Sequence, residues 1–161
     1  DASEDKVTTD GYDTVQMLIS TNPGECIRPL KDVVSGGELS RIMLAIKTSL
    51  ASKDEIDTLV FDEIDTGISG KTAWLVSEKM GKLAKCHQLL CITHLPQIAA
   101  RANAHLLIEK NVTSDATVTG ISMLSEKESV EELARMLGGM SITEAVRNNA
   151  IEMKKMAKNE A

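Results

Sequence analysis

Aromatic residues are almost missing from this chain of 161 residues. Tyr12, Phe61 and Trp74 are the only ones, so a hydrophobic core has to be built from leucine, isoleucine, valine, methionine and alanine. Hydrophobic residues nevertheless make up 42% of the chain and charged residues 26%. A chain of this length and composition is typical of one globular domain that buries about 68–70% of its unfolded surface.

Cysteines and long apolar runs are also scarce. Cys26, Cys86 and Cys91 are odd in number and have no C-x-x-C spacing, so neither a disulfide framework nor a zinc site is indicated. No apolar run approaches the roughly 18 residues of a membrane span, and no signal peptide opens the chain. We therefore expect a reducing, cytoplasmic setting without a membrane partner.

Positive charge is not in excess. The net charge of -6 argues against a chain whose main role is to grip a nucleic-acid backbone, because that affinity comes from clustered lysine and arginine. A local basic patch is still compatible with this charge. The chain also lacks an initiating methionine and begins with a polar stretch, residues 1–10. We expect it to be a segment of a longer protein.

Two adjacent carboxylates follow an apolar run near the middle of the chain. The run, residues 58–61, predicts a strand that is buried on both faces of a parallel sheet. Asp62 and Glu63 then lie at its carboxyl end, where open α/β sheets bind ligands. One carboxylate could support hydrated Mg²⁺ while the other orients or deprotonates an attacking water. Taken alone, the stretch fits a strand followed by an ordinary helix cap about equally well.

A glycine-rich turn precedes a predicted helix. Ser35, Gly36 and Gly37 are followed by apolar residues at helical spacing. Free N–H groups and the positive end of a helix dipole bind phosphate, and the glycines let the backbone approach a ligand closely. A capped helix after a loop is the plainer interpretation of these three residues. The predicted inward face consists of Leu39, Ile42, Met43, Ile46 and Leu50.

A strand–helix–strand unit connects the two carboxylates to a histidine. Residues 71–85 predict a helix, and residues 88–93 predict a second buried strand that ends at His94. In a βαβ unit the carboxyl ends of both strands meet at one edge of a parallel sheet. Glu63 and His94 should therefore share one site. The predicted inward face of the helix consists of Leu75, Val76, Met80, Leu83 and Ala84.

The remaining elements are predicted from periodicity and turn residues. They are a strand over 15–19, a turn over 21–25, an irregular stretch over 26–34, a short helix from Pro96 to about Arg101, a hairpin of strands 104–109 and 117–124, a helix that ends at Gly138-Gly139, and a last helix that starts at the capping box Ser141–Glu144.

A phosphate-binding P-loop is absent from the sequence. Residues 67–72 resemble one, but the pattern G-x-x-x-x-G-K-[ST] requires glycine where this chain has Asp65. A carboxylate pair for Mg²⁺ without a P-loop is half of a nucleotide site.

Three ordered motifs carry a resemblance to a known family. Residues 35–41, the strand that ends at Asp62-Glu63, and Thr93-His94 resemble the signature, Walker B and switch-histidine motifs of the ABC ATPase superfamily. Within it, residues 19–25, 61–70 and 92–100 resemble the RecN family of bacterial DNA-repair proteins, an SMC-like branch. The resemblance covers about residues 11–150.

The resemblance implies roles for individual residues. Asp62 is similar to the Walker B aspartate that supports Mg²⁺, Glu63 to the catalytic glutamate, and His94 to the switch histidine that contacts the γ-phosphate of ATP. Asp65 falls at the D-loop position, which couples two sites across a dimer. The signature residues, which cap the ATP of the opposite protomer, correspond to Ser35, Gly36, Gly37 and Glu38.

The implied fold is an α/β, three-layer ABC-type ATPase head lobe that is incomplete without an N-terminal lobe carrying Walker A. Residues 1–10 would be a polar linker near a coiled coil, and residues 11–161 the C-terminal lobe. The implied partners are that lobe, a second head protomer and, through the full-length protein, DNA in double-strand-break repair. The implied location is cytoplasmic and nucleoid-associated.

Two alternatives stay open. One is the nucleotide-binding domain of a transporter, although transporters usually continue Walker B with Pro-Thr-Ser, whereas this chain has Ile64-Asp65-Thr66. The other is a non-catalytic dimerisation module, against which the presence of both Glu63 and His94 argues.

Overall fold

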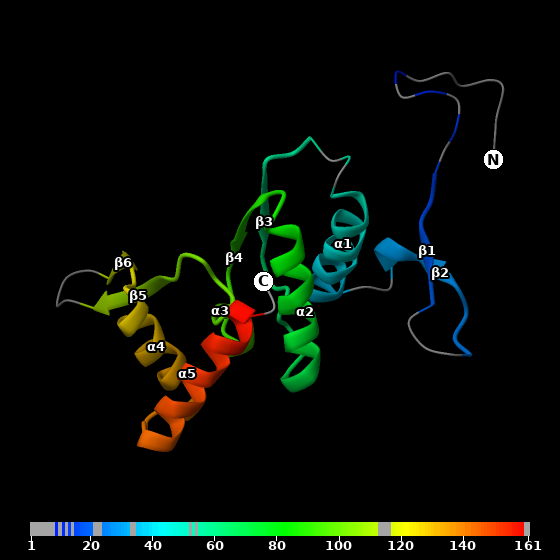
Figure 1. Cartoon of the computed structure of the whole chain (residues 1–161). Coiled ribbons are helices and arrows are strands. Elements are labelled where there is room, and N and C mark those ends of the chain that lie inside the picture. Colours follow the sequence, from blue (N-terminus) through cyan, green and yellow to red (C-terminus); the bar gives the residue numbers. More distant parts are fainter. Residues whose placement is uncertain are drawn as a thin grey trace. The chain divides into compact units, whose positions relative to one another are not determined.

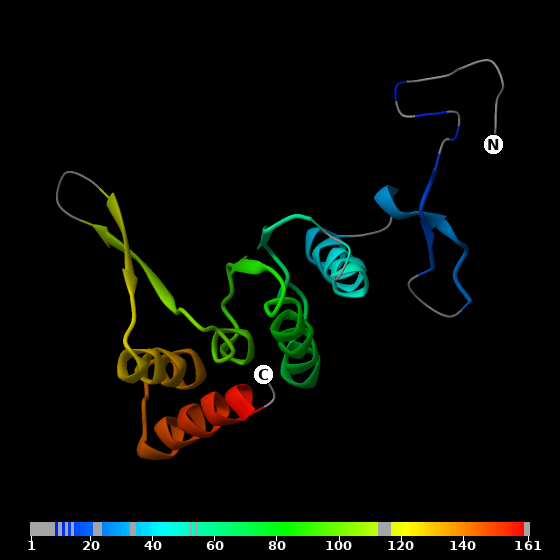
Figure 2. The same cartoon turned by 45° about the horizontal axis from the view of Figure 1, so that its top comes forward.

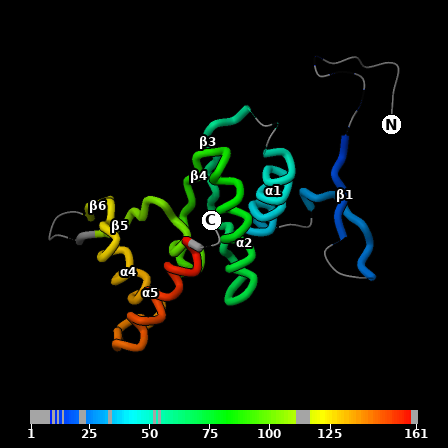
Figure 3. The backbone as a smooth tube through the Cα atoms, viewed as in Figure 1, coloured from blue at the N-terminus to red at the C-terminus, as the bar shows by residue number. Residues whose placement is uncertain are grey.

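The computed structural model describes residues 9, 11, 13, 15–20, 24–32, 35–51, 53, 55–112 and 117–159. The chain forms two compact units, Asp1–Ser35 and Gly36–Ala161, and each is described by itself. Figures 1 and 2 show the elements from two directions, and Figure 3 traces the backbone through them. The predicted linker over residues 1–10 stays a prediction, because only residue 9 of it is described.

The first unit contains a short antiparallel pair of strands. β1 (Leu18–Ile19) pairs with β2 (Arg28–Pro29), and the Leu30 N–H donates to the Met17 carbonyl at 2.9 Å. A single 3-10 turn, η1 (Leu30–Asp32), follows. The strand predicted over 15–19 is thus confirmed for its last two residues. Within the predicted turn, residues 21–23 lie outside the described part of the chain.

The second unit carries the α/β architecture that the sequence predicts. Its elements are α1 (Gly36–Leu50), β3 (Thr58–Phe61), α2 (Gly70–Leu83), β4 (Gln88–Cys91), α3 (Pro96–Ala99), β5 (Leu106–Val112), β6 (Thr117–Met123), α4 (Glu126–Gly138) and α5 (Glu144–Asn159). In chain order, α1 packs on α2, α2 on α3, α3 on α4 and α4 on α5.

The predicted βαβ unit is present. β3 and β4 pair in parallel, with Thr58 opposite Gln88 and Phe61 opposite Cys91. Their burial, however, corrects the prediction of strands buried on both faces: the side chains of Val60 and Leu90 are 67% and 47% exposed. Successive side chains of a strand point to opposite faces, and the described residues cover well only the face that carries Phe61. The other face remains apolar and open.

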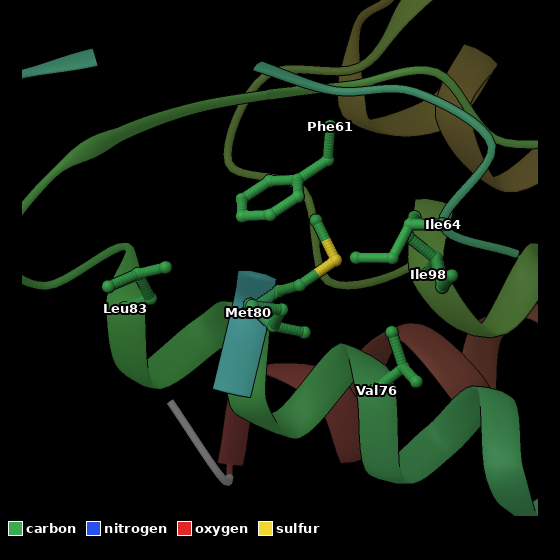
Figure 4. Packing of buried hydrophobic residues seen from close by; sticks show 7 residues of the cluster. Phe61, Ile64, Val76, Met80, Leu83 and Ile98 are labelled. Carbon is green, nitrogen blue, oxygen red and sulfur yellow. The ribbon is translucent and has the colours of Figure 1, made fainter. Parts of the chain in front are cut away.

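The core of this unit lies between the parallel strands and α2. Figure 4 shows the Met80 side chain extending from α2 toward Phe61 and Ile64. Ile64 and Leu83 are fully buried. Burying a side chain of this size contributes about 1.5–3 kcal/mol to the free energy of unfolding. Aliphatic side chains can therefore stabilise this core although aromatic residues are few. The cluster consists of Leu44, Phe61, Ile64, Val76, Met80, Leu83 and Ile98.

The predicted inward faces of α1 and α2 are partly wrong. On α1 the buried large side chain is Leu44, whereas the predicted Leu39, Met43 and Leu50 are 42%, 40% and 48% exposed. On α2, Val76, Met80 and Leu83 are buried as predicted, but the predicted Leu75 and Ala84 are exposed. Helical periodicity identifies the apolar stripe of a helix. It does not show which part of the stripe another element covers, and only the covered residues reach the core.

The last two helices form a second core. α4 and α5 pack against each other through small and aliphatic residues. A capping box precedes α4: the Ser125 hydroxyl accepts from the Glu128 N–H at 3.3 Å, and the Glu128 carboxylate accepts from the Ser125 N–H at 2.8 Å. α5 begins at Glu144, and the Thr143 hydroxyl accepts from the Val146 N–H at 3.3 Å. Because Thr143 and not Ser141 caps this helix, the box predicted at Ser141–Glu144 is misplaced.

The predicted hairpin is confirmed. β5 and β6 pair antiparallel, with Leu106 opposite Met123 and Ile108 opposite Ile121. The residues of the turn itself, 113–116, lie outside the described part. No helix among the described residues is both long enough and apolar enough to cross a membrane.

Candidate functional site

The acidic turn after β3 is the centre of the site. Asp62 and Glu63 are exposed, and the Glu63 N–H donates to Asp62 Oδ1 at 2.8 Å. Glu63 has a φ of 56°, in the left-handed region that residues other than glycine rarely adopt. Such backbone outliers cluster at functional sites, where the surrounding structure holds them in place. The predicted pair of carboxylates therefore occupies a specially shaped turn rather than an ordinary helix cap.

Helix α1 is fastened to this turn by side chains of its first two turns. The Ser40 hydroxyl donates to the Asp62 carbonyl at 2.8 Å. The Arg41 guanidinium donates to the carbonyls of Ile64 and Thr66 at 3.2 and 2.9 Å. The sequence prediction included Arg41 only as part of a motif, since nothing in a single sequence shows that its guanidinium reaches a turn more than twenty residues away.

The two glycines at the start of α1 lie directly against Glu63. A Cβ atom on Gly36 would collide with Glu63 Oε2. A Cβ atom on Gly37 would lie 2.7 Å from the Glu63 carbonyl oxygen and 3.0 Å from Thr66 Cβ. The absence of side chains therefore lets the acidic turn approach the N-terminus of α1, which suits a negative charge. The structure brings these predicted site residues together.

Asp65 and His94 are joined by a compact hydrogen-bond cluster. Asp65 is 3% exposed, and its Oδ2 accepts from the Thr93 hydroxyl at 2.7 Å and from the His94 N–H at 2.8 Å. His94 Nδ1 lies 2.9 Å from the same oxygen. This contact confirms that the carboxyl ends of β3 and β4 share one edge. The Asp65 carboxylate is engaged within its own chain, so its predicted effect across a dimer stays a prediction.

Hydrogen bonding sets the charge state of Asp65. Burial alone raises the pKa of a carboxyl group, but the Thr93 hydroxyl, the His94 N–H and the His94 ring together hold the pKa of Asp65 below its usual range. Cys91, at the end of β4, behaves oppositely: burial, followed by the carboxylates of Asp65 and Asp62, raises the pKa of its thiol to about 12. A thiol with this pKa stays protonated near neutral pH and is a poor nucleophile.

Two predicted residues lie beside this cluster. Glu38 is half-buried in the first turn of α1. Ser35 is exposed and immediately precedes α1, but it belongs to the first unit, so its placement at the site stays a prediction.

The donor set fits a Mg²⁺ ion that is held mainly by its substrate. Among the described residues no group of three or more histidines, cysteines or carboxylates forms a complete metal site. Mg²⁺ is usually bound through one or two carboxylates, together with water and substrate phosphates. The exposed Asp62 carboxylate at the end of β3 offers oxygens of this kind, and its role as the Mg²⁺ ligand stays a prediction.

Comparisons with known proteins point in one direction. No protein-family model matches the chain. DNA repair protein RecN of Bacillus subtilis is 45% identical over 152 residues, which are 94% of this chain and 26% of that protein. RecN of Treponema pallidum is 50% identical over 129 residues, covering 80% of this chain and 22% of that protein. RecN of Vibrio cholerae is 45% identical over 143 residues, which are 89% of this chain and 26% of that protein.

A solved structure also aligns with the chain. It comes from work on the ATP-driven dimerization and DNA-stimulated activation of SMC ATPases, with a TM-score of 0.49 and 20% identity over 77% of this chain and 81% of that chain. The chain spans about a quarter of the length of the curated relatives it matches. Because these relatives are 45–50% identical in sequence over 80–94% of this chain, the chain belongs to the RecN family of DNA repair proteins.

Proposed function

We propose that this chain is the C-terminal half of the ATPase head of a RecN-type protein that acts in DNA double-strand-break repair and recombination. It supplies the signature, Walker B, D-loop and switch-histidine elements, while another part of the protein supplies Walker A. Two heads bind ATP and Mg²⁺ between them, and the full-length protein contacts DNA in the cytoplasm.

The observation that carries the proposal is the convergence at one sheet edge. The Asp62-Glu63 turn follows β3, His94 follows β4, and the two are linked through Asp65. The glycines at the start of α1 pack against the same turn. Ligands of open α/β sheets bind outside the carboxyl ends of the strands, so Asp62, Glu63 and His94, which resemble the Walker B and switch residues, lie at the edge where such a fold would bind a nucleotide.

Each residue has a task that its chemistry allows. Asp62 would hold the hydrated Mg²⁺, which neutralises charge on the phosphates when it is bound. Glu63 would orient and deprotonate the attacking water, a role worth typically 10²–10⁴-fold in rate. His94 would contact the γ-phosphate with the ring edge that faces away from Asp65. Ser35, Gly36, Gly37 and Glu38 would cap the nucleotide of the opposite protomer through the N-terminus of α1.

The proposal is tested by ATP-dependent association of this chain with a separately produced N-terminal lobe that carries Walker A. We expect ATP to drive assembly of dimeric heads in the wild type. Ser35→Arg should block that assembly, because it places a bulky cation at the start of α1. Glu63→Gln should prolong it, because the amide keeps the size of the side chain but cannot deprotonate water. Association is followed by sedimentation velocity with ATP and with ADP.

A matched control separates the site from the rest of the surface. Glu144 is exposed in the first turn of α5, and the variant Glu144→Gln should behave like the wild type. If association is indifferent to ATP and to both site substitutions, the motifs serve only to dimerise, and the ATPase proposal is wrong.

A further inference from the structure

The Asp65 carboxylate is buried at a place where it can hold an exposed ring. Its side chain is 4% exposed, whereas the His94 side chain is 72% exposed. Two donors bind the single oxygen Oδ2, the Thr93 hydroxyl at 2.7 Å and the His94 N–H at 2.8 Å, and the His94 ring nitrogen Nδ1 lies 2.9 Å from the same oxygen. An exposed histidine ring usually rotates freely, so this anchoring is a specific feature of the turn.

The chemistry of the pair fixes which ring nitrogen carries the proton. An ionised carboxylate only accepts hydrogen bonds, and a neutral imidazole carries one N–H and one bare nitrogen. At 2.9 Å from Asp65 Oδ2, a bare ring nitrogen would set its lone pair against the carboxylate, so the nitrogen at this place, Nδ1, is the one that carries the proton. The bare nitrogen of the neutral ring is then Nε2, on the exposed edge. The partner of one ring nitrogen thus decides whether the other ring nitrogen carries a proton.

The anchor is itself rigidly supported. The Thr93 hydroxyl donates to Asp65 and accepts from the Leu95 N–H at 3.0 Å, which closes the start of the segment after β4. On the other side, Arg41 of α1 holds the carbonyls that flank Asp65, those of Ile64 and Thr66. The orientation of His94 is thus coupled through Asp65 to the turn that carries Glu63.

We propose that Asp65 is the positioning residue of His94: it fixes the Nδ1–H tautomer and presents Nε2 outward, toward the phosphate-bearing substrate. The identity of that substrate rests on the proposed function, whereas the orientation of the ring does not. In this proposal Asp65 acts through His94. Its contribution is to remove the rotations of the ring that would point Nε2 away, a loss of geometry that can cost up to about 10²-fold in rate.

The test reads the tautomer directly in the full-length protein that carries this chain. Long-range ¹H–¹⁵N correlations of histidine-labelled protein at alkaline pH distinguish N–H from bare ring nitrogens, and His94→Gln assigns the His94 signals by their loss. We expect protonated Nδ1 and bare Nε2 in the wild type. Asp65→Ala should release the ring to a mixture of tautomers. Asp65→Asn keeps an acceptor oxygen and should retain the wild-type tautomer at least in part.

Thr93→Val is the matched control, because it removes a hydrogen bond to the same oxygen without touching the ring. It should leave the tautomer unchanged. If wild-type His94 instead carries its proton on Nε2, or if Asp65→Ala leaves its signals unchanged, the inference is wrong. The wild-type spectrum decides this even if Asp65→Ala fails to fold.

Kinetics then separate this inference from the proposed function. In an ATP-hydrolysing full-length protein, Asp65→Ala should lower kcat by roughly 10- to 100-fold with little change in KM. In a His94→Gln background the same substitution should cause little further loss, because the two residues act as one unit. Equal losses in both backgrounds contradict the inference. A protein that shows the predicted tautomer but never hydrolyses ATP contradicts the proposed function alone.

Discussion

Gly36 and Gly37 are neighbours in sequence, but they face different parts of Glu63. The first lies against the end of a flexible side chain, and the second against backbone. A flexible carboxylate can move aside, whereas the turn after β3 is held by Ser40 and Arg41. The two glycines should therefore respond differently to the same added methyl group.

Gly37→Ala should lower the free energy of unfolding by about 1–3 kcal/mol, the usual cost of overpacking. Gly36→Ala should change stability by less than about 0.5 kcal/mol, but should displace the Glu63 carboxylate and lower ATP hydrolysis by the full-length protein. Urea denaturation and steady-state hydrolysis provide the two measurements. Equal stability losses for both variants would show that the Glu63 side chain is as fixed as its backbone.

His105 gives a prediction about pH at the same scale. The Lys154 ammonium donates to Ser129 Oγ at 2.5 Å, and His105 Nδ1 lies 2.8 Å from the same oxygen. Ser129 Oγ therefore lies between the Lys154 ammonium and the His105 ring. Burial, and then the charge of Lys154, lower the pKa of His105, and Glu132 opposes them only in part. Folding therefore disfavours the charged form of the His105 ring.

The sign of the pH dependence follows from linkage. Below the unfolded-state pKa of about 6.5, the unfolded chain binds a proton that the folded chain resists, so the free energy of unfolding falls as pH drops toward the folded-state value. His105→Gln should remove this part of the slope. Urea denaturation between about pH 5 and about pH 8 measures it. Parallel profiles for the wild type and the variant would contradict the assignment.

At this scale the sequence predicted which residues would meet at the sheet edge, but not how they are connected. The positions of Asp62, Glu63 and His94 follow from the carboxyl ends of two strands, which a βαβ pattern places together. The burial of Asp65 and its contacts with Thr93 and His94 depend on the path of the turn and on Arg41. No periodicity encodes such a path, so the contact between Asp65 and His94 could not be predicted.

Among the elements, the start of each late helix is set by one hydroxyl. Ser125 caps α4 in a reciprocal box with Glu128, whereas Ser141 lies before Thr143, the residue that caps α5. Both serines satisfy the pattern S-x-x-E. The pattern alone cannot choose between them, because the choice depends on which residue leaves the helical conformation.

Ser125→Ala should therefore destabilise the chain by about 1 kcal/mol, the typical value of an N-cap. Ser141→Ala, the matched control, should stay within about 0.5 kcal/mol of the wild type. Urea denaturation measures both. If the two substitutions cost the same, the capping assignment at Ser125 is wrong.

The strands show how far element prediction reaches. Their positions and parallel pairing followed from two short apolar runs that flank a helical pattern. The prediction that both faces of these strands are buried was wrong at Val60 and Leu90. An apolar run reflects every contact that a strand makes in the full-length protein, including contacts that this chain alone does not supply. Apolar side chains that stay this exposed among the described residues predict that another part of the protein packs there.

For the whole molecule, the proposed division of the head between two parts of a protein predicts an inactive fragment. The sequence holds no P-loop, so this chain alone lacks the lysine and backbone N–H groups that would cradle the phosphates. We expect negligible ATP hydrolysis by the isolated chain. Mg²⁺-dependent turnover that Glu63→Gln abolishes would contradict this expectation.

Open apolar surface on the hairpin predicts that the isolated chain self-associates. The strand register places Leu106, Ile108, Ile121 and Met123 on one face, and they are 49%, 54%, 66% and 69% exposed. Contiguous apolar patches of this kind mark interaction surfaces or drive aggregation. Sedimentation velocity should show association that increases with concentration, and the N-terminal lobe should suppress it if that lobe covers this face.

A double substitution tests the source of that association. Ile108→Thr with Ile121→Thr should reduce it while leaving the free energy of unfolding nearly unchanged, because both side chains are already exposed and threonine suits a strand. Leu107→Thr is the control: this residue is half-buried on the opposite face, so its loss should lower stability without relieving association. A wild-type chain that sediments as a monomer at every concentration would show that the exposed face needs no partner.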